Sequence, residues 1–235
     1  MIAGLSKAFH LYLAPLLSLT SFILILFSYL APIILFPTQV SLLEVTPSTA
    51  LTQSKSSDGV DGPSIFLGAL GSCARSKNDA SVTCTPPTVS PAYDLSVLPS
   101  SAPDLLSAPT ATTPAFIAVS LAFTIIFFML FTLTSFRGKM GKFGNVLGKP
   151  GVQRATAWIG LLGFLIGITS FLVIRMWFGK AVEDFNAGIA KAGSDGPELI
   201  ASTSNGFVMV WVGFAFYAVP VVCSLAKFHV VAGKA

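Results

Sequence analysis

Residues 137–154 read RGKMGKFGNVLGKPGVQR, and this stretch sets the orientation of the whole chain. It contains five basic residues and no acidic one, and it separates two long apolar runs. Short loops rich in Lys and Arg remain on the cytosolic side of a membrane, whereas acidic residues have little influence on orientation. We therefore predict a cytosolic loop that contacts anionic lipid of the inner leaflet through Arg137, Lys139, Lys142, Lys149 and Arg154.

The composition is that of an integral membrane protein. Of the 235 residues, 53% are hydrophobic and only 10% are charged, and the mean hydropathy is +0.78. A soluble domain carries roughly 25% charged residues. The net charge of +4 does not point to nucleic acid, because the basic residues cluster beside apolar runs, where lipid is the nearer partner.

Four apolar runs are each long enough to cross a hydrocarbon core of about 30 Å, which takes about 20 helical residues. An even number of spans places both termini in the cytosol, and every Asp and Glu then falls outside the cell. The predicted order is a cytosolic N-terminus (1–10), span one (11–36), a first extracellular loop (37–114), span two (115–136), the basic loop (137–154), span three (155–178), a second extracellular loop (192–206), span four (207–225) and a cytosolic C-terminus (226–235).

The first extracellular loop divides into two halves. In the first half, three β-prone pieces (40–46, 65–72 and 81–85) are separated by polar turns, which predicts a small antiparallel sheet. The second half (84–114) is rich in Ser, Thr and Pro and does not bury enough apolar surface to order itself alone. Tyr93 and several leucines are candidates to pin it against the sheet, and O-glycosylation of this half is left open.

The apolar pattern of span three does not stop at the membrane. Apolar residues continue three or four positions apart to about residue 191, with charged residues between them, so we predict that the helix extends outside the membrane. The extension needs a cover for its apolar stripe, and the sheet is the expected cover. Arg175 is expected to lie at the interface or pair with Glu183 or Asp184. The stripe is Ile174, Phe178, Val182, Phe185 and Ile189.

Two of the three cysteines are predicted to pair. Cys73 and Cys84 both lie in the extracellular loop, in an oxidising space and beside two predicted strands, which favours a disulfide over two free thiols. Cys223 lies toward the cytosolic end of span four. It is either a small buried apolar side chain or a site of palmitoylation.

Span three carries three glycines near one face, Gly160, Gly163 and Gly167. The Gly163-xxx-Gly167 spacing lets helices approach closely. Packing against another span of the same chain is favoured over an oligomer contact, because this spacing is common in membrane helices.

No set of residues predicts catalysis, a cofactor or a metal site. There is no Ser/His/Asp or Cys/His set, no pair of carboxylates facing a span and no phosphate loop. His10 and His229, the only histidines, are expected to be solvated residues near the inner surface rather than pH sensors. Spans one, two and four lack charge in their middles, which argues against an ion pathway. We expect no enzyme and no small-molecule substrate.

The four spans, the extended third helix and a large first loop with Gly68-x-x-Gly71-x-Cys73 followed by Cys84 resemble the claudin-like superfamily. The chain is most similar to its fungal branch, which includes the eisosome-associated Sur proteins and the pH-response protein PalI. The resemblance implies a four-helix bundle capped by a small extracellular antiparallel sheet, located in the plasma membrane. It also implies a role in membrane organisation, cell-wall or stress signalling rather than catalysis.

Three functional hypotheses are weighed, on the basis of the resemblance, the lack of catalytic residues, the predicted sheet and the glycine face of span three. The first is a non-catalytic organiser or scaffold of a fungal membrane domain, in lateral contact with lipids, with itself or with other membrane proteins. The second is an accessory subunit of a larger membrane enzyme, pump or transporter. The third is a component of a PalI-type ambient pH sensor, although only residues 226–235 follow span four, whereas such sensors commonly carry a long cytosolic tail.

Overall fold

The structure is a computed structural model that describes residues 9–52, 60–105 and 110–232. The chain forms two compact units, which are described separately below. The first, called the helical unit, comprises Met1–Leu26, Phe116–Thr169 and Val210–Ala235. The second, called the sheet unit, comprises Phe27–Ala115 and Ser170–Met209.

Among the described residues, four helices are long and apolar enough to cross a membrane, which is consistent with the prediction of a multi-pass membrane protein. The segments with this length and composition are Leu11–Leu30, Thr112–Ser135, Pro150–Asp195 and Asn205–Ala226. The corresponding elements are a π-helix η1 (Phe9–Leu13) followed by α2 (Ala14–Leu30), then α3 (Thr112–Ser135), α5 (Pro150–Ala192) and α6 (Asn205–Ala232).

Aromatic rings and small residues fill the interior of the helical unit. Phe127 packs edge-on against Tyr217 with ring centroids 5.5 Å apart, and Phe164 packs edge-on against Phe214 at 5.7 Å. Large side chains on the outer faces of the same helices, such as Val119 and Leu165, remain exposed. This distribution suits a membrane, because lipid solvates exposed apolar side chains while close packing holds the helices together.

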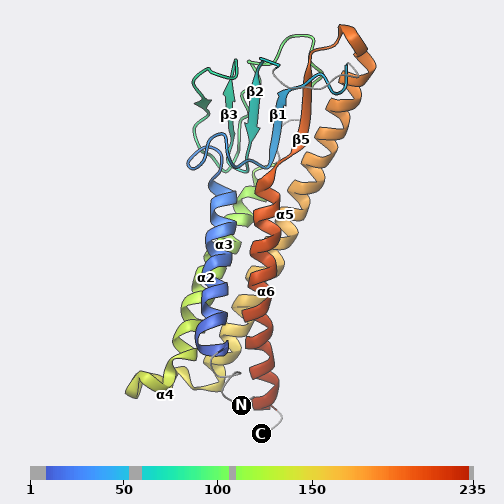
Figure 1. The fold of residues 1–235 in the computed structure, drawn as a ribbon. Coiled ribbons are helices and arrows are strands. Elements are labelled where there is room, and N and C mark those ends of the chain that lie inside the picture. Colours follow the sequence, from blue (N-terminus) through green and yellow to red (C-terminus); the bar gives the residue numbers. More distant parts are fainter. Residues whose placement is uncertain (1–8, 53–59, 106–109, 233–235) are drawn as a thin grey trace. The chain divides into compact units, whose positions relative to one another are not determined.

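The sheet unit contains a five-stranded antiparallel sheet among the described residues, in the order β4-β3-β2-β1-β5. Figure 1 shows β3, β2, β1 and β5 side by side. The chain therefore combines four long apolar helices with a small antiparallel sheet, as predicted. The strands are β1 (Leu43–Pro47), β2 (Ser64–Leu67), β3 (Ser72–Arg75), β4 (Thr83–Cys84) and β5 (Leu199–Thr203).

Strand β5 was not predicted, because residues 192–206 were assigned to a loop. It pairs with β1 from Leu43 opposite Thr203 to Pro47 opposite Leu199. The Glu44 carboxylate adds to this pairing by accepting hydrogen bonds from the Ser202 and Ser204 hydroxyls, at 3.3 and 3.0 Å. The segment between α2 and α3 and the segment between α5 and α6 thus both contribute strands to one sheet.

The predicted strand at 65–72 covers most of β2 and a turn, and it reaches only the first residue of β3. β2 ends at Leu67 and β3 begins at Ser72. The Gly68 N–H donates to the Gly71 carbonyl at 2.9 Å and closes the turn between them. Gly71 has a φ of 150°, which favours glycine. Two glycines therefore break what the apolar pattern presents as a continuous strand.

The membrane-crossing elements also differ from the predicted bounds. Helix α2 ends at Leu30, before Pro32, so the last residues of predicted span one (11–36) are not helical. The predicted basic loop (137–154) contains a 3₁₀ turn η2 (Arg137–Lys139), a short helix α4 (Gly141–Leu147) and the start of α5. Pro150 suits the first position of α5, where its missing amide costs no hydrogen bond.

Candidate interaction surfaces

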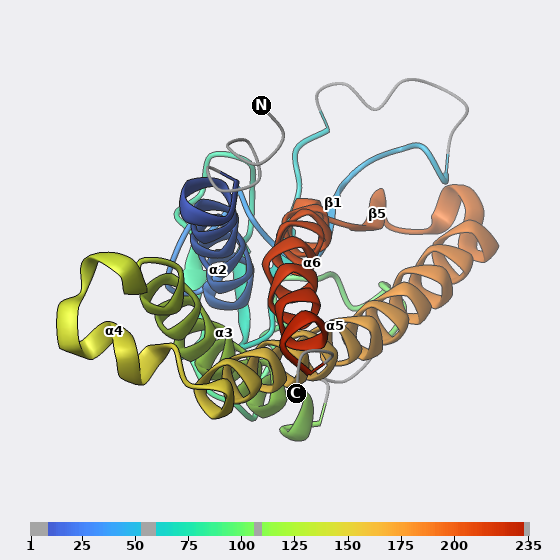
Figure 2. The same cartoon turned by 90° about the horizontal axis from the view of Figure 1, so that it is seen from below.

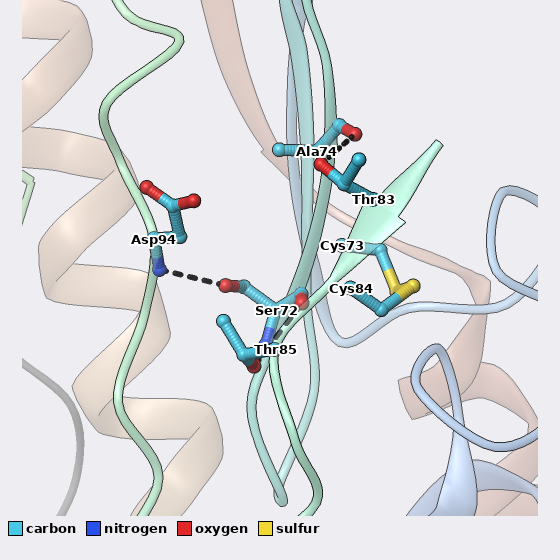
Figure 3. Close-up of a disulfide and its surroundings, with 7 residues drawn as sticks. All are labelled: Ser72, Cys73, Ala74, Thr83, Cys84, Thr85 and Asp94. Carbon is cyan, nitrogen blue, oxygen red and sulfur yellow. Dashed lines mark hydrogen bonds between the residues drawn. A yellow bond between two sulfur atoms is a disulfide. The ribbon is translucent and has the colours of Figure 1, made fainter. Parts of the chain in front are cut away.

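The disulfide joins the last two strands on one side of the sheet. Cys73 in β3 and Cys84 in β4 are directly opposite in register and form the predicted bond (Figure 3). Cys73 is buried and Cys84 is exposed. The two-residue strand β4 is also held by the Thr83 hydroxyl, which donates to the Ala74 carbonyl at 3.4 Å, and by the Thr85 amide, which donates to the Ser72 carbonyl at 2.9 Å.

The Ser/Thr/Pro-rich half of the loop is attached to the sheet by polar contacts. The Asp94 amide donates to the Ser72 hydroxyl at 2.9 Å, a contact drawn in Figure 3. The Tyr93 hydroxyl donates to the Gly68 carbonyl at 2.8 Å, and the Tyr93 ring lies 6.3 Å from the ring of Phe178. Burial raises the pKa of Tyr93 above its ordinary value. Tyr93 therefore joins this segment to both the sheet and α5.

The glycines of the Gly68-x-x-Gly71-x-Cys73 motif allow two close backbone contacts. A Cβ at Gly68 would overlap the Ala31 carbonyl, so the turn lies directly on the chain that follows α2. A Cβ at Gly71 would lie 2.5 Å from the Thr85 hydroxyl and 2.6 Å from a methyl group of Ile33. The motif thus has a physical role within the sheet unit, since any larger residue at either position would displace a neighbour.

The part of α5 that belongs to the sheet unit buries an apolar stripe. Four members of the predicted stripe, Ile174, Phe178, Phe185 and Ile189, are buried, and the fifth, Val182, is half-buried. Gly188 lies against Pro103 of the Ser/Thr/Pro-rich segment, where a Cβ would come within 2.6 Å of the proline ring. The cover of this helix therefore includes the extended segment as well as the strands.

Asn186 is a key residue that the sequence interpretation missed. Its side-chain oxygen accepts a hydrogen bond from the Ala201 amide, and its side-chain nitrogen donates to the Ala201 carbonyl, both at 2.8 Å. The carboxamide thus pairs with β5 as a neighbouring strand would, and it satisfies the outer edge of the sheet. In the sequence, the feature that could have pointed to Asn186 is that it is an uncharged polar residue between the apolar stripe and the charged face of the helix.

Of the two alternatives predicted for Arg175, pairing with Glu183 or Asp184 is not found in the structure. Lys180, rather than Arg175, contacts the two acids, with its ammonium 3.6 Å from Glu183 and 2.7 Å from Asp184. The Arg175 guanidinium lies 5.1 Å from the centre of the Phe207 ring instead. Lys180 is closer along the helix, because residues three and four positions apart share one face, whereas Arg175 is eight or nine positions away.

The glycine face of α5 packs against helices of the same chain. A Cβ at Gly160 would lie 2.5 Å from the Phe127 ring, and one at Gly163 would lie 3.0 Å from both the Phe123 Cβ and the Tyr217 hydroxyl. A Cβ at Gly167 would overlap the Ser120 hydroxyl. That hydroxyl donates to the Gly163 carbonyl at 2.8 Å. These glycines are therefore used within the helical unit.

The basic segment forms a cleft rather than an extended loop. Arg137, Gly138, Gly144, Asn145, Gly148 and Lys149 line a space of about 490 Å³. Lys139, Lys142 and Arg154, the other predicted lipid contacts, are exposed outside this lining. Figure 2 shows α4 beside α3 and the first turns of α5, on the side away from α6. The structure thus separates the five basic residues into two in the cleft and three around it.

The remaining candidate residues lie apart from these surfaces. Cys223 is half-buried in α6. His10 and His229 fall in η1 and α6, and their side chains are outside the described part of the structure. Within the described residues, no three His, Cys, Asp or Glu side chains gather as metal ligands would. No model of a known protein family matches the sequence, and no curated protein matches it.

Proposed function

We propose that this protein is a non-catalytic organiser of a membrane domain in the fungal plasma membrane, linked to cell-wall or stress responses. The sheet unit carries the proposal. Both outer segments contribute to one antiparallel sheet, the disulfide closes one side of it, and Asn186 caps the other. A folded outer body of this kind provides a fixed surface for lateral contacts.

Two independent features support an orientation with the sheet unit outside and both termini in the cytosol. Disulfides persist in oxidising spaces, and Cys73–Cys84 lies in the sheet unit. The acid-free basic segment, which favours the cytosolic side, lies in the helical unit.

The glycine face of α5 is already used within the chain, so lateral contacts with other molecules would use other surfaces. Because Gly160, Gly163 and Gly167 contact α3 and α6 of the same chain, they are not available for a second copy. Exposed apolar side chains on the helices suit lipid, and the exposed strand β4 is available on the sheet unit. We infer that contacts with itself or with other membrane proteins use the sheet unit and the lipid-facing sides.

One surface favours the alternative of an accessory subunit. Leu172, Val173, Met176 and Trp177 form an exposed apolar ridge on α5, and Met176 alone is 75% exposed. Their spacing of one, three and four positions places them on a single helix face. A transmembrane helix of a larger enzyme, pump or transporter would fit such a ridge, as would lipid.

The proposal is tested by imaging the full-length chain, tagged at its N-terminus, in a living fungal cell. We expect stable patches in the plasma membrane. Loss of the disulfide in a Cys73→Ser/Cys84→Ser variant should disperse the patches, while Cys223→Ser, the same substitution outside the sheet unit, should leave them intact. An even distribution of the unaltered protein, or patches that depend on Cys223 and not on the disulfide, would contradict the proposal.

A further inference from the structure

We propose that the cleft beside α4 binds the phosphate of an anionic phospholipid headgroup, while the exposed apolar face of α4 inserts among the acyl chains. This inference rests on the proposed contact between the basic segment and the inner leaflet. The basic segment would then bind lipid at one defined site rather than through five separate charges.

The lining of the cleft provides donors without acceptors of opposite charge. Arg137 and Lys149 contribute two cations, and Asn145 contributes an amide. Residues 137–154 contain no acid, and within the described part of the chain neither cation has an ion-pair partner. An arginine fork together with a lysine suits a phosphate group, because guanidinium and ammonium donors form strong charge-assisted hydrogen bonds to its oxygens.

Glycines bring the two sides of the cleft together. A Cβ at Gly144 would overlap the Arg137 carbonyl, so α4 packs directly on the backbone of η2. A Cβ at Gly148 would lie 3.8 Å from an Nη1 of Arg137, which places the guanidinium beside this second glycine. Gly144 is buried, whereas Arg137, Asn145 and Lys149 are exposed, so a packed backbone presents these donors at the surface.

The apolar side of α4 selects a lipid rather than a soluble phosphate compound. Phe143 is 72% exposed and Val146 is 50% exposed, and they lie one turn apart, while the neighbouring residues Gly144 and Leu147 are buried. Helix α4 follows α3 by five residues and precedes α5 by two, so it lies next to the ends of two membrane helices. A short basic helix with an apolar face in this position binds at the lipid interface.

Native mass spectrometry of the full-length protein in a neutral detergent tests the site, with phosphatidic acid as the probe and phosphatidylcholine as the reference lipid. The test variant is Arg137→Gln/Lys149→Gln, and the matched control is Lys139→Gln/Lys142→Gln, which removes the same charge outside the cleft. We expect the test variant to bind phosphatidic acid at least about 10-fold more weakly and the control to change by less than about 3-fold. Binding of phosphatidylcholine should be unaffected in both.

A second pair of variants separates a lipid from a free phosphate. Phe143→Ser should weaken binding of phosphatidic acid several-fold, whereas Phe116→Ser, an exposed phenylalanine at the other end of α3, should not. If inorganic phosphate displaces the lipid and Phe143→Ser has no effect, the site is one for a soluble anion and the proposal is wrong.

Failure of the cleft can be told apart from failure of the leaflet contact. Salt-dependent binding to anionic liposomes can be measured for Arg137→Gln/Lys149→Gln and for Lys139→Gln/Lys142→Gln. If binding falls equally in the two variants, the contact with the inner leaflet is retained and the proposal of a specific site in the cleft is wrong. Unchanged liposome binding in both variants would overturn the leaflet contact and the cleft together, and would leave the basic segment with a role in orientation alone.

Discussion

Asn186 and Tyr93 are single residues that join separate parts of the sheet unit. Each side chain makes hydrogen bonds to backbone groups more than ten positions away. Tyr93 was recognised in the sequence, together with several leucines, as a candidate to pin the Ser/Thr/Pro-rich segment against the sheet. Asn186 was not, because its role depends on β5, whose position beside α5 is not encoded in the local pattern.

Replacing Asn186 with Ala should expose the edge of β5. Two hydrogen bonds at 2.8 Å would be lost, and the unfolding free energy of the sheet unit should fall by about 1–3 kcal/mol. Hydrogen exchange provides the most local measurement, because the Ala201 amide donates to Asn186 and should exchange faster in the variant.

The matched control for this variant is Asn78→Ala. The Asn78 side chain also donates a hydrogen bond, to the Val60 carbonyl at 2.9 Å, but this contact is exposed to water. Its loss should change stability by less than about 0.5 kcal/mol. Equal effects of the two substitutions would argue against a structural role for the Asn186 cap.

Tyr93 should remain un-ionised in the folded protein at a pH where free tyrosine has lost its proton. Burial raises the folded-state pKa above the ordinary value of 10.0, so the folded state favours the neutral phenol. The resulting stability is fully present below pH 10 and is lost as the pH rises through the folded-state pKa. Comparing phenolate absorbance of the unaltered protein and Tyr93→Phe during alkaline titration measures this, and ionisation of Tyr93 near its ordinary pKa would contradict it.

Among the elements, those with a long regular pattern were predictable from sequence. The four membrane-crossing helices follow from runs of apolar residues, and the extension of α5 follows from its recurring stripe. Strand β5 was missed because five residues after a Gly-Pro pair give no periodic signal, and its partner β1 lies more than 150 positions away. Helix α4 was missed because glycine is a poor helix former, although Gly144 is required where the backbones touch.

The disulfide should behave as one unit between β3 and β4. Cys73→Ser and Cys84→Ser should each destabilise the sheet unit by about 2–3 kcal/mol, since the bond closes a short loop. The double variant should lose no more than either single variant, because both substitutions remove the same bond. Thermal unfolding of the three proteins under oxidising conditions measures this, and losses that simply add would mean that each sulfur has a separate role.

Two glycines of α5 should respond in opposite directions to the same substitution. Gly167→Ala should destabilise the helical unit by about 1–3 kcal/mol, because the new methyl group overlaps the Ser120 hydroxyl and lies 2.7 Å from the Phe214 ring. Gly179→Ala places a methyl group in open space and should stabilise the helix by up to about 1 kcal/mol. Thermal stability in detergent compares the two, and equal effects would show that the glycine face is not tightly packed.

For the whole molecule, the structure contains the four long apolar helices and the small antiparallel sheet that the sequence predicts. In the helical unit, the glycines of α5 pack against neighbouring helices of the same chain. In the sheet unit, the disulfide holds one side of the sheet and Asn186 pairs with the strand at the other side. The proposed organiser would then contact its surroundings through the outer surface of the sheet unit, the lipid-facing helices and the cleft beside α4.

The most direct test of this account is the composition of the complex that the protein forms in its own membrane. The full-length chain should be purified in a gentle detergent, weighed as an intact particle and analysed by mass spectrometry. We predict assemblies of this chain with itself together with retained anionic phospholipid. Copurification of one large membrane protein at a fixed stoichiometry would contradict the organiser proposal and identify the chain as an accessory subunit.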